Sequence, residues 1–129
     1  MKALNANQDP VLIVEDHADT AEMLRRLLAR NGFAADVAMN AAEAIEKLER
    51  QRPTCLILDE TMPGMTGLEL MRHIQAHPKH REIPVLFYSA AFDAQKQAQA
   101  KAMGAKGWFI KGVSRLPDLV EQVKEVRGN

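Results

Sequence analysis

Short apolar runs alternate along this chain with longer segments in which apolar residues recur three and four positions apart. The runs are expected to form strands, and they cover residues 11–14, 35–38, 55–58, 85–88 and 107–110. Four of them are apolar without alternation, and the weaker run 35–38 is the exception. Strands that are apolar on both faces are typical of a parallel sheet covered by helices. The pattern therefore predicts βα units around one parallel sheet.

Five helices are expected between and after these runs, because the apolar residues there fall on one helical face. These residues are Met23, Leu24, Leu27 and Leu28; Ala44, Ile45 and Leu48; Leu68, Met71 and Ile74; Ala94, Ala98 and Ala102; and Leu116, Leu119, Val120 and Val123. The segment 93–103 carries only alanines at this spacing, with glutamines and lysines between them, so we expect weak packing and the highest mobility there. Gly32 and Gly104 stand where helix C-caps are needed.

Five strands that alternate with five helices predict a doubly wound α/β sandwich. The length of 129 residues suits one domain of about 100–150 residues, which we place at 10–129. Residues 1–9 are mostly polar and lead into a proline, so we expect a short disordered leader there. In a sheet of this kind the ligand site lies at the carboxyl ends of the strands, where the winding direction reverses.

Charge and composition exclude several classes of function. The chain has 17 basic and 17 acidic residues, so no basic excess favours direct binding of nucleic acid. It has no signal-peptide pattern and no apolar stretch of the roughly 20 residues that cross a membrane, and we expect a cytoplasmic protein without membrane contact. The only cysteine, Cys55, lies in an apolar run, where we expect a buried and unreactive thiol.

Polar side chains stand at the ends of the predicted strands. Glu15 and Asp16 follow the first strand, and Asp59, Ser89 and Lys111 follow the third, fourth and fifth. Strand ends are wet and commonly polar, which would explain any one of these residues alone. Five converging residues of complementary chemistry favour a functional site instead.

The chemistry of these residues favours a metal and a phosphoryl group. Three converging carboxylates repel one another unless a cation compensates them. Mg²⁺ or Mn²⁺ suits Glu15, Asp16 and Asp59, because such hard ions prefer oxygen ligands. Phosphoryl transfer needs a nucleophile, a metal and donors to the phosphoryl oxygens, roles that Asp59, the metal, Lys111 and Ser89 could fill.

Four sequence blocks carry a resemblance to a known family. They are Val11–Asp16 (VLIVED), Leu56–Gly67 (LILDETMPGMTG), Pro84–Ala90 (PVLFYSA) and Ile110–Lys111. In this order they resemble the signature blocks of response-regulator receiver domains of two-component systems, of the chemotaxis-regulator kind. The resemblance extends from about residue 11 to the C-terminus, and the second block is the most specific.

The resemblance implies a flavodoxin-like sheet with strand order 2-1-3-4-5 and a role for each site residue. It implies that Asp59 is the phosphoacceptor and that Glu15, Asp16 and the backbone carbonyl of Thr61 serve the metal. Ser89 would donate to the phosphoryl group, and Lys111 would pair with Asp59 or its phosphate. Ala90 would leave space for the incoming group, and the aromatic Trp108 would change rotamer with Ser89.

The implied function is a phosphoacceptor switch rather than an enzyme acting on other molecules. A sensor histidine kinase or phosphotransfer protein would supply the phosphoryl group, and the downstream target would be a protein that the sequence does not identify. Any output domain is expected on another chain. The resemblance also implies that the side chains at Thr61 and Ala91 tune loss of the phosphoryl group, and neither is charged, so we expect a state that lasts minutes or longer.

Two residues depart from the usual receiver pattern. Glu15 replaces an aspartate, which is a conservative change, and Gly112 replaces the proline that usually follows the lysine. A cis bond before a residue other than proline costs about 2.5–4 kcal/mol, so we predict a trans bond between Lys111 and Gly112. We also predict that the loop 112–114 is more mobile than the loop after Asp59.

Two other functions remain open at this point. Gly112 supports a pseudo-receiver, an interaction module that does not need phosphorylation. A phosphatase of the haloacid-dehalogenase type would need an acidic residue two positions after the nucleophile, where this chain has Thr61.

Several residues have ordinary structural interpretations. His17 is expected as an exposed residue at the start of the first helix rather than as a ligand. His73, His77 and His80 are loosely spaced around Pro78 and are not expected to form a metal site. Met62 and Met65 are expected to pack within their loop. Trp108 lies near the expected sheet edge, where partial exposure with a signalling role and a core position are both open.

Overall fold

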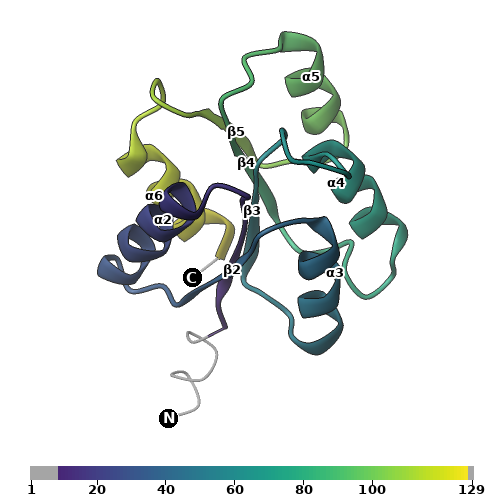
Figure 1. The fold of residues 1–129 in the computed structure, drawn as a ribbon, viewed down its shortest axis with the longest axis horizontal. Coiled ribbons are helices and arrows are strands. Elements are labelled where there is room, and N and C mark those ends of the chain that lie inside the picture. Colours follow the sequence, from purple (N-terminus) through teal and green to yellow (C-terminus); the bar gives the residue numbers. More distant parts are fainter. Residues whose placement is uncertain (1–8, 128–129) are drawn as a thin grey trace.

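The computed structural model describes residues 9–127 and shows five strands and five helices in strict alternation (Figure 1). The strands are β1 (Val11–Val14), β2 (Ala35–Ala38), β3 (Cys55–Leu58), β4 (Val85–Ser89) and β5 (Gly107–Ile110). The helices are α2 (Ala18–Arg30), α3 (Ala41–Arg50), α4 (Gly67–Ala76), α5 (Ala94–Ala102) and α6 (Leu116–Arg127). Of the predicted leader, residues 1–8 lie outside the described part of the chain.

The sheet has the predicted topology. All strand pairs are parallel, and the order is β2-β1-β3-β4-β5. Every predicted strand is present with the predicted bounds, except that β4 continues through Ser89. Ser89 is therefore the last residue of a strand rather than the first residue of a loop.

Helices cover both faces of the sheet. Helices α2 and α6 lie on one face, and α3, α4 and α5 lie on the other (Figure 1). The three inner strands β1, β3 and β4 are buried along their whole length, whereas the edge strand β5 is only partly buried. The apolar runs read from the sequence are thus the strands between two helical layers.

Helix α5 is the least embedded of the helices. Only Ala100 of this helix is buried, because alanines and polar residues offer little apolar area to the core. The mobility expected for this segment remains a prediction. In helix α2, Met23 is more exposed than expected, at 36%, and Leu24 and Leu28 form the buried face.

Loops and helix ends agree with the sequence pattern. Gly32 and Gly104 follow α2 and α5 with φ of +88° and +102°, as their C-cap positions predict. Met62 is buried and Met65 packs against the same core. Among residues 9–127, no helix is long and apolar enough to cross a bilayer.

Cys55 is expected to be unreactive in the native protein. The side chain is fully buried at the start of β3, and burial raises the pKa of its thiol to about 12. Because the thiolate is the reactive form, the native chain at pH 8 should resist Ellman's reagent, whereas the chain unfolded in guanidinium should react at once. Rapid stoichiometric reaction of the native protein would contradict the buried position.

Candidate functional site

Three carboxylates meet at the carboxyl end of the sheet because β1 and β3 are neighbours in register. Val14 pairs with Leu58, so the residues that follow them emerge side by side. The Asp59 amide donates to the Val14 carbonyl at 3.0 Å, which continues the ladder by one residue. Carboxylate oxygens of Glu15, Asp16 and Asp59 lie within 4.8 Å of one another. The predicted cluster is present.

Lys111 reaches this cluster from beyond the end of β5. Its ammonium lies 2.8 Å from Glu15 Oε1 and 3.3 Å from Asp59 Oδ2. Burial lowers the pKa of Lys111, but the hydrogen bond to Glu15 and the charges of Asp59 and Glu15 outweigh burial, so the pKa is raised above its ordinary value. The lysine is a cation at neutral pH, and it compensates part of the negative charge of the cluster.

The residues of the cluster suit a hard divalent cation. Glu15 and Asp59 are buried, and Oδ1 of Asp16 is a buried oxygen that accepts no hydrogen bond from the described residues. A buried carboxylate oxygen without a donor is costly unless a cation serves it. The donor set is rich in oxygen, as Mg²⁺ and Mn²⁺ prefer. The amide of Thr61 donates to Asp59 Oδ1 at 3.2 Å, which places this loop beside the carboxylate.

His17 lies closer to the cluster than the sequence suggested. It opens α2 and its side chain is 69% exposed, as expected. Its Nδ1 nevertheless lies 3.1 Å from Glu15 Oε2 and 3.4 Å from Asp16 Oδ1, and the ring belongs to the same group of possible ligands. The chain bends at Asp16, and the His17 amide donates to Glu15 Oε2 at 3.1 Å. This backbone geometry brings the ring to the carboxylates, a detail that residue spacing does not reveal.

Ser89 is buried at the end of β4 but makes no hydrogen bond to Asp59 among the described residues. Its Oγ instead accepts from the amide of Ala91 at 3.2 Å. The serine is thus held by the turn that leads toward α5.

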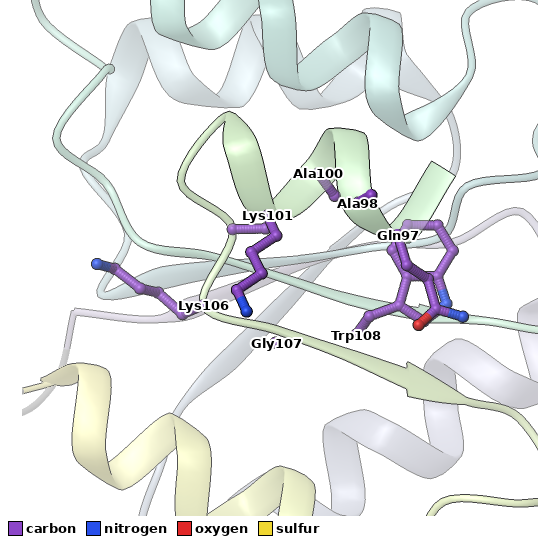
Figure 2. Close-up of a pocket in the computed structure, with 8 residues that line it drawn as sticks. Gln97, Ala98, Ala100, Lys101, Lys106, Gly107 and Trp108 are labelled. Atoms are coloured by element: carbon purple, nitrogen blue, oxygen red, sulfur yellow. The ribbon is translucent and has the colours of Figure 1, made fainter. Parts of the chain in front are cut away.

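Trp108 is partly buried on the edge strand β5. Its ring stacks on Phe87 with centroids 4.7 Å apart, and its Nε1 donates to the carbonyl of Ala91 at 3.2 Å. It lies at one end of a hollow of about 370 Å³ between α5 and β5, with Lys106 at the other end (Figure 2). Of the two positions that the sequence left open for Trp108, the structure shows partial exposure, and the indole contacts the same turn that holds Ser89.

Gly112, which replaces the proline usual at this position, has a backbone conformation that proline could not adopt. All peptide bonds in residues 9–127 are trans, which confirms the predicted trans bond after Lys111. Gly112 has φ of +79°, a region that other residues rarely adopt. The amide of Ser114 returns to the Ile110 carbonyl at 2.8 Å, and its Oγ accepts from the Ile110 amide. The altered loop therefore redirects the chain without moving Lys111 away from Asp59.

Glu60 was not singled out by its position in the sequence. It follows Asp59 directly, yet its carboxylate is buried and contacts both the start of α4 and Lys96 of α5. The only sign of Glu60 in the sequence is that it is a second acidic residue in the most specific block. Its partners Leu68 and Lys96 lie eight and 36 positions further along the chain.

The remaining histidines, His73, His77 and His80, lie outside the group of possible metal ligands found in the described part of the chain. Among residues 9–127, the only group of three or more possible ligands is the one that contains Asp59. His77 and His80 stack with centroids 4.2 Å apart, and burial, followed by the nearby His77, lowers the pKa of His80. His80 is buried, so it is a core residue rather than a solvated one.

Known proteins resemble this chain in both sequence and fold. A family model described as the response regulator receiver domain matches residues 11–124. The phosphate regulon transcriptional regulatory protein PhoB of Rhizobium meliloti is 31% identical over 114 residues, which are 88% of this chain and 50% of that protein. The chain therefore spans about half the length of this relative.

Solved structures superpose over nearly the whole chain. A putative response regulator from Chloroflexus aurantiacus matches with a TM-score of 0.86 at 28% identity and covers 95% of this chain and 99% of that one. The response regulator protein TrrA from Thermotoga maritima, in complex with Mg²⁺-BeF, matches with a TM-score of 0.80 at 27% identity and covers 92% and 99%.

Proposed function

Since this chain belongs to the response regulator receiver domain family, we propose that it is a switch that accepts a phosphoryl group on Asp59. The observation that carries the proposal is the convergence of Glu15, Asp16 and Asp59 with the Lys111 ammonium 3.3 Å from Asp59 Oδ2. A nucleophilic carboxylate, oxygen ligands for a metal and a fixed cation are what phosphoryl transfer requires.

Each residue has a distinct task in this proposal. An Asp59 oxygen forms the new bond to phosphorus while the bond from phosphorus to the donor's leaving group breaks, and that group leaves with the electron pair. Glu15, Asp16, Asp59 and the Thr61 carbonyl would hold Mg²⁺ or Mn²⁺, and that ion would neutralise charge on the phosphoryl oxygens. Lys111 pairs with a further phosphoryl oxygen.

The donor is proposed to be a sensor histidine kinase or a phosphotransfer protein. The TrrA structure supports the proposal that a metal binds together with the phosphoryl group, because that related protein was solved with Mg²⁺ and the phosphoryl mimic beryllofluoride. The pseudo-receiver alternative rests on Gly112 alone. It is less well supported, because the trans bond leaves Lys111 in contact with Asp59.

Direct phosphorylation tests the proposal. The purified chain should gain the mass of one phosphoryl group when it is incubated with Mg²⁺ and acetyl phosphate, and it should gain none when the metal is chelated. Absence of the adduct under both conditions, together with failure to bind beryllofluoride, would support the pseudo-receiver instead.

The proposed partner-binding face comprises α5, β5 and α6. It contains the partly exposed Trp108 and the weakly packed α5, and the hollow of Figure 2 lies within it. Weak local packing lowers the free energy of rearrangement, so a change at the phosphorylation site can be expressed on this face.

The emission of Trp108 is expected to change when beryllofluoride binds with Mg²⁺. A Ser89 side chain that rotates toward the bound group would move its Oγ away from the Ala91 amide, and the carbonyl of Ala91 accepts the hydrogen bond of the indole. Activation is then a shift between two packed states. Trp108 is the only tryptophan, so steady-state fluorescence and iodide quenching report on it alone. Binding seen by ¹⁹F NMR with unchanged emission and quenching would make it an ordinary packing residue.

The phosphorylated state is expected to last minutes or longer, and Ala91→Glu should shorten it. A carboxylate at this position could act as a charged anchor and general base for the attacking water, a role that neither the Ala91 methyl group nor the uncharged Thr61 hydroxyl can fill. The decay is measured by intact mass after removal of the phosphodonor. Ala94→Glu adds the same charge to an exposed position nearby and should leave the decay unchanged. Equal decay in all three proteins would refute the role of position 91.

A further inference from the structure

A buried carboxylate next to the phosphoacceptor joins three elements. Both ends of the loop that follows β3 are held by Glu60. Its backbone carbonyl accepts from the Gly67 amide at 3.0 Å, and its Oε1 accepts from the Leu68 amide at 2.8 Å. Its Oε2 lies 3.3 Å from Lys96 Nζ on α5. The loop between Asp59 and α4 is therefore closed by one residue.

Capping of α4 does not account for this arrangement. Thr66 and Glu69 already form a capping box at the start of the helix, with the Thr66 hydroxyl accepting from the Glu69 amide and the Glu69 carboxylate from the Thr66 amide. An exposed acidic residue would suffice to favour the helix dipole. Glu60 is instead 2% exposed, and a desolvated carboxylate at this depth is costly unless a cation and donors compensate it.

The compensating cation comes from a distant segment. Lys96 is the third residue of α5, its side chain is 43% exposed, and its amide is held by Asp93 at the helix start. No other Lys or Arg pairs with Glu60 in the described part of the chain. Loss of Lys96 would leave a buried charge without a cation, and the loop would have to open for water to reach that charge.

We infer that Glu60, held by Lys96, is a positioning residue for the metal and phosphoacceptor site. The inference rests on the proposed function, because the loop that Glu60 closes begins at Asp59 and carries the Thr61 carbonyl proposed to serve the metal. An outer partner that orients a metal ligand changes metal affinity although it does not touch the metal. Since Lys96 belongs to α5, the position of this helix and the metal affinity become linked, and each influences the other.

Two lysines of α5 allow a matched test of Mn²⁺ binding. Lys96→Met and Lys101→Met remove the same charge from the same helix, but Lys101 makes no ion pair in residues 9–127 and lines the hollow of Figure 2 instead. Loss of a cation by itself should slightly tighten binding of a divalent ion. Loss of positioning should instead weaken Mn²⁺ binding by about tenfold, the low end for outer partners of a metal ligand. The loss of charge and the loss of positioning therefore predict opposite changes in the affinity for Mn²⁺.

The dissociation constant of Mn²⁺ is measured directly on the full chain from the electron paramagnetic resonance signal of the free ion. We expect Lys96→Met to weaken Mn²⁺ binding about tenfold and Lys101→Met to leave it unchanged or tighter. Lys96→Arg keeps the cation and should bind Mn²⁺ as the unaltered chain does. Equal constants for the two methionine variants would overturn the inference while leaving the phosphoacceptor proposal intact. Absence of Mn²⁺ binding by the unaltered chain would overturn both.

The Lys96→Met substitution, made again in a chain that carries Glu60→Gln, shows whether Lys96 acts through Glu60. Glu60→Gln keeps an oxygen for the Leu68 amide but needs no cation. In that background Lys96→Met should leave Mn²⁺ binding unchanged or slightly tighter, because the two side chains act as a unit and only the loss of charge remains. The double variant leaves no buried charge unpaired, so it is usable even if the single variant does not fold. A tenfold weakening that persists in the Glu60→Gln background would overturn the inference.

Discussion

Replacement of Asp59 by asparagine is expected to abolish phosphorylation by acetyl phosphate. The amide has no nucleophilic carboxylate oxygen, whereas its size and shape are nearly the same. The fold should persist, because Lys111 keeps its closer contact, at 2.8 Å, with Glu15, and one of three mutually repelling charges is removed. We expect the free energy of unfolding to stay unchanged or to rise slightly, because relief of the repulsion among the carboxylates offsets loss of the 3.3 Å ion pair with Lys111. Intact mass after incubation with Mg²⁺ and acetyl phosphate measures the loss.

Asp36→Asn is the matched control for this substitution. Asp36 lies on the edge strand β2 and pairs with Lys47 at 3.0 Å, away from the site. This variant should be labelled like the unaltered chain. Stoichiometric labelling of Asp59→Asn would show that another residue is the acceptor.

Gly67→Ala is expected to lower the free energy of unfolding by about 2–3 kcal/mol. A Cβ atom at this position would lie 2.5 Å from the Asp59 carbonyl oxygen and 3.0 Å from the Phe87 ring. The first residue of α4 thus packs directly on the backbone of the phosphoacceptor. Helix propensity alone would have Ala raise the stability by up to about 1 kcal/mol, so the two effects have opposite signs. Urea unfolding followed by circular dichroism measures the difference.

Gly107→Ala separates this contact from the general effect of adding a methyl group. The added Cβ would lie 2.9 Å from the Phe109 ring, a side chain on a partly buried edge strand that can move. We expect a loss of stability smaller than that of Gly67→Ala, and unchanged phosphorylation. An unchanged or higher stability of Gly67→Ala would contradict the close packing of α4 against Asp59.

The apolar runs by themselves determined that the chain forms a parallel sheet covered by helices on both faces. A four-residue segment such as Cys55–Leu58, with no polar position, has no face to offer to water, so it must lie inside a sheet covered on both sides. The bounds of the inner strands follow directly, and they are the ones observed, except that β4 continues through Ser89. The segment 94–102 shows the same logic in reverse, because a stripe of alanines cannot bury much area, and only Ala100 is buried.

The strand-end positions also determined which residues could form the site. Glu15 and Asp59 emerge together because their strands are adjacent and parallel, and chemistry alone indicated a metal and a phosphoryl group. The strand order itself came from the resemblance to receiver domains. Periodicity does not state which strands are neighbours, since the same runs fit several sheet orders.

Only the tertiary structure decided the contacts that join distant segments. Lys111 meets Glu15 more closely than Asp59, Ser89 is held by Ala91, and the ring of His17 turns back toward the carboxylates. Each of these depends on where a loop ends to within a few ångströms, and residue type and spacing do not contain that distance.

Glu60 shows the difference most clearly. In the sequence it is one acidic residue in a loop, where solvent exposure is the ordinary expectation. In the folded chain Glu60 contacts the Leu68 amide at the start of α4 and the Lys96 ammonium on α5. These contacts compensate the charge and make its burial possible. The environment of a charged side chain is set by elements that close over it, so it is a property of the assembled layers rather than of the local sequence.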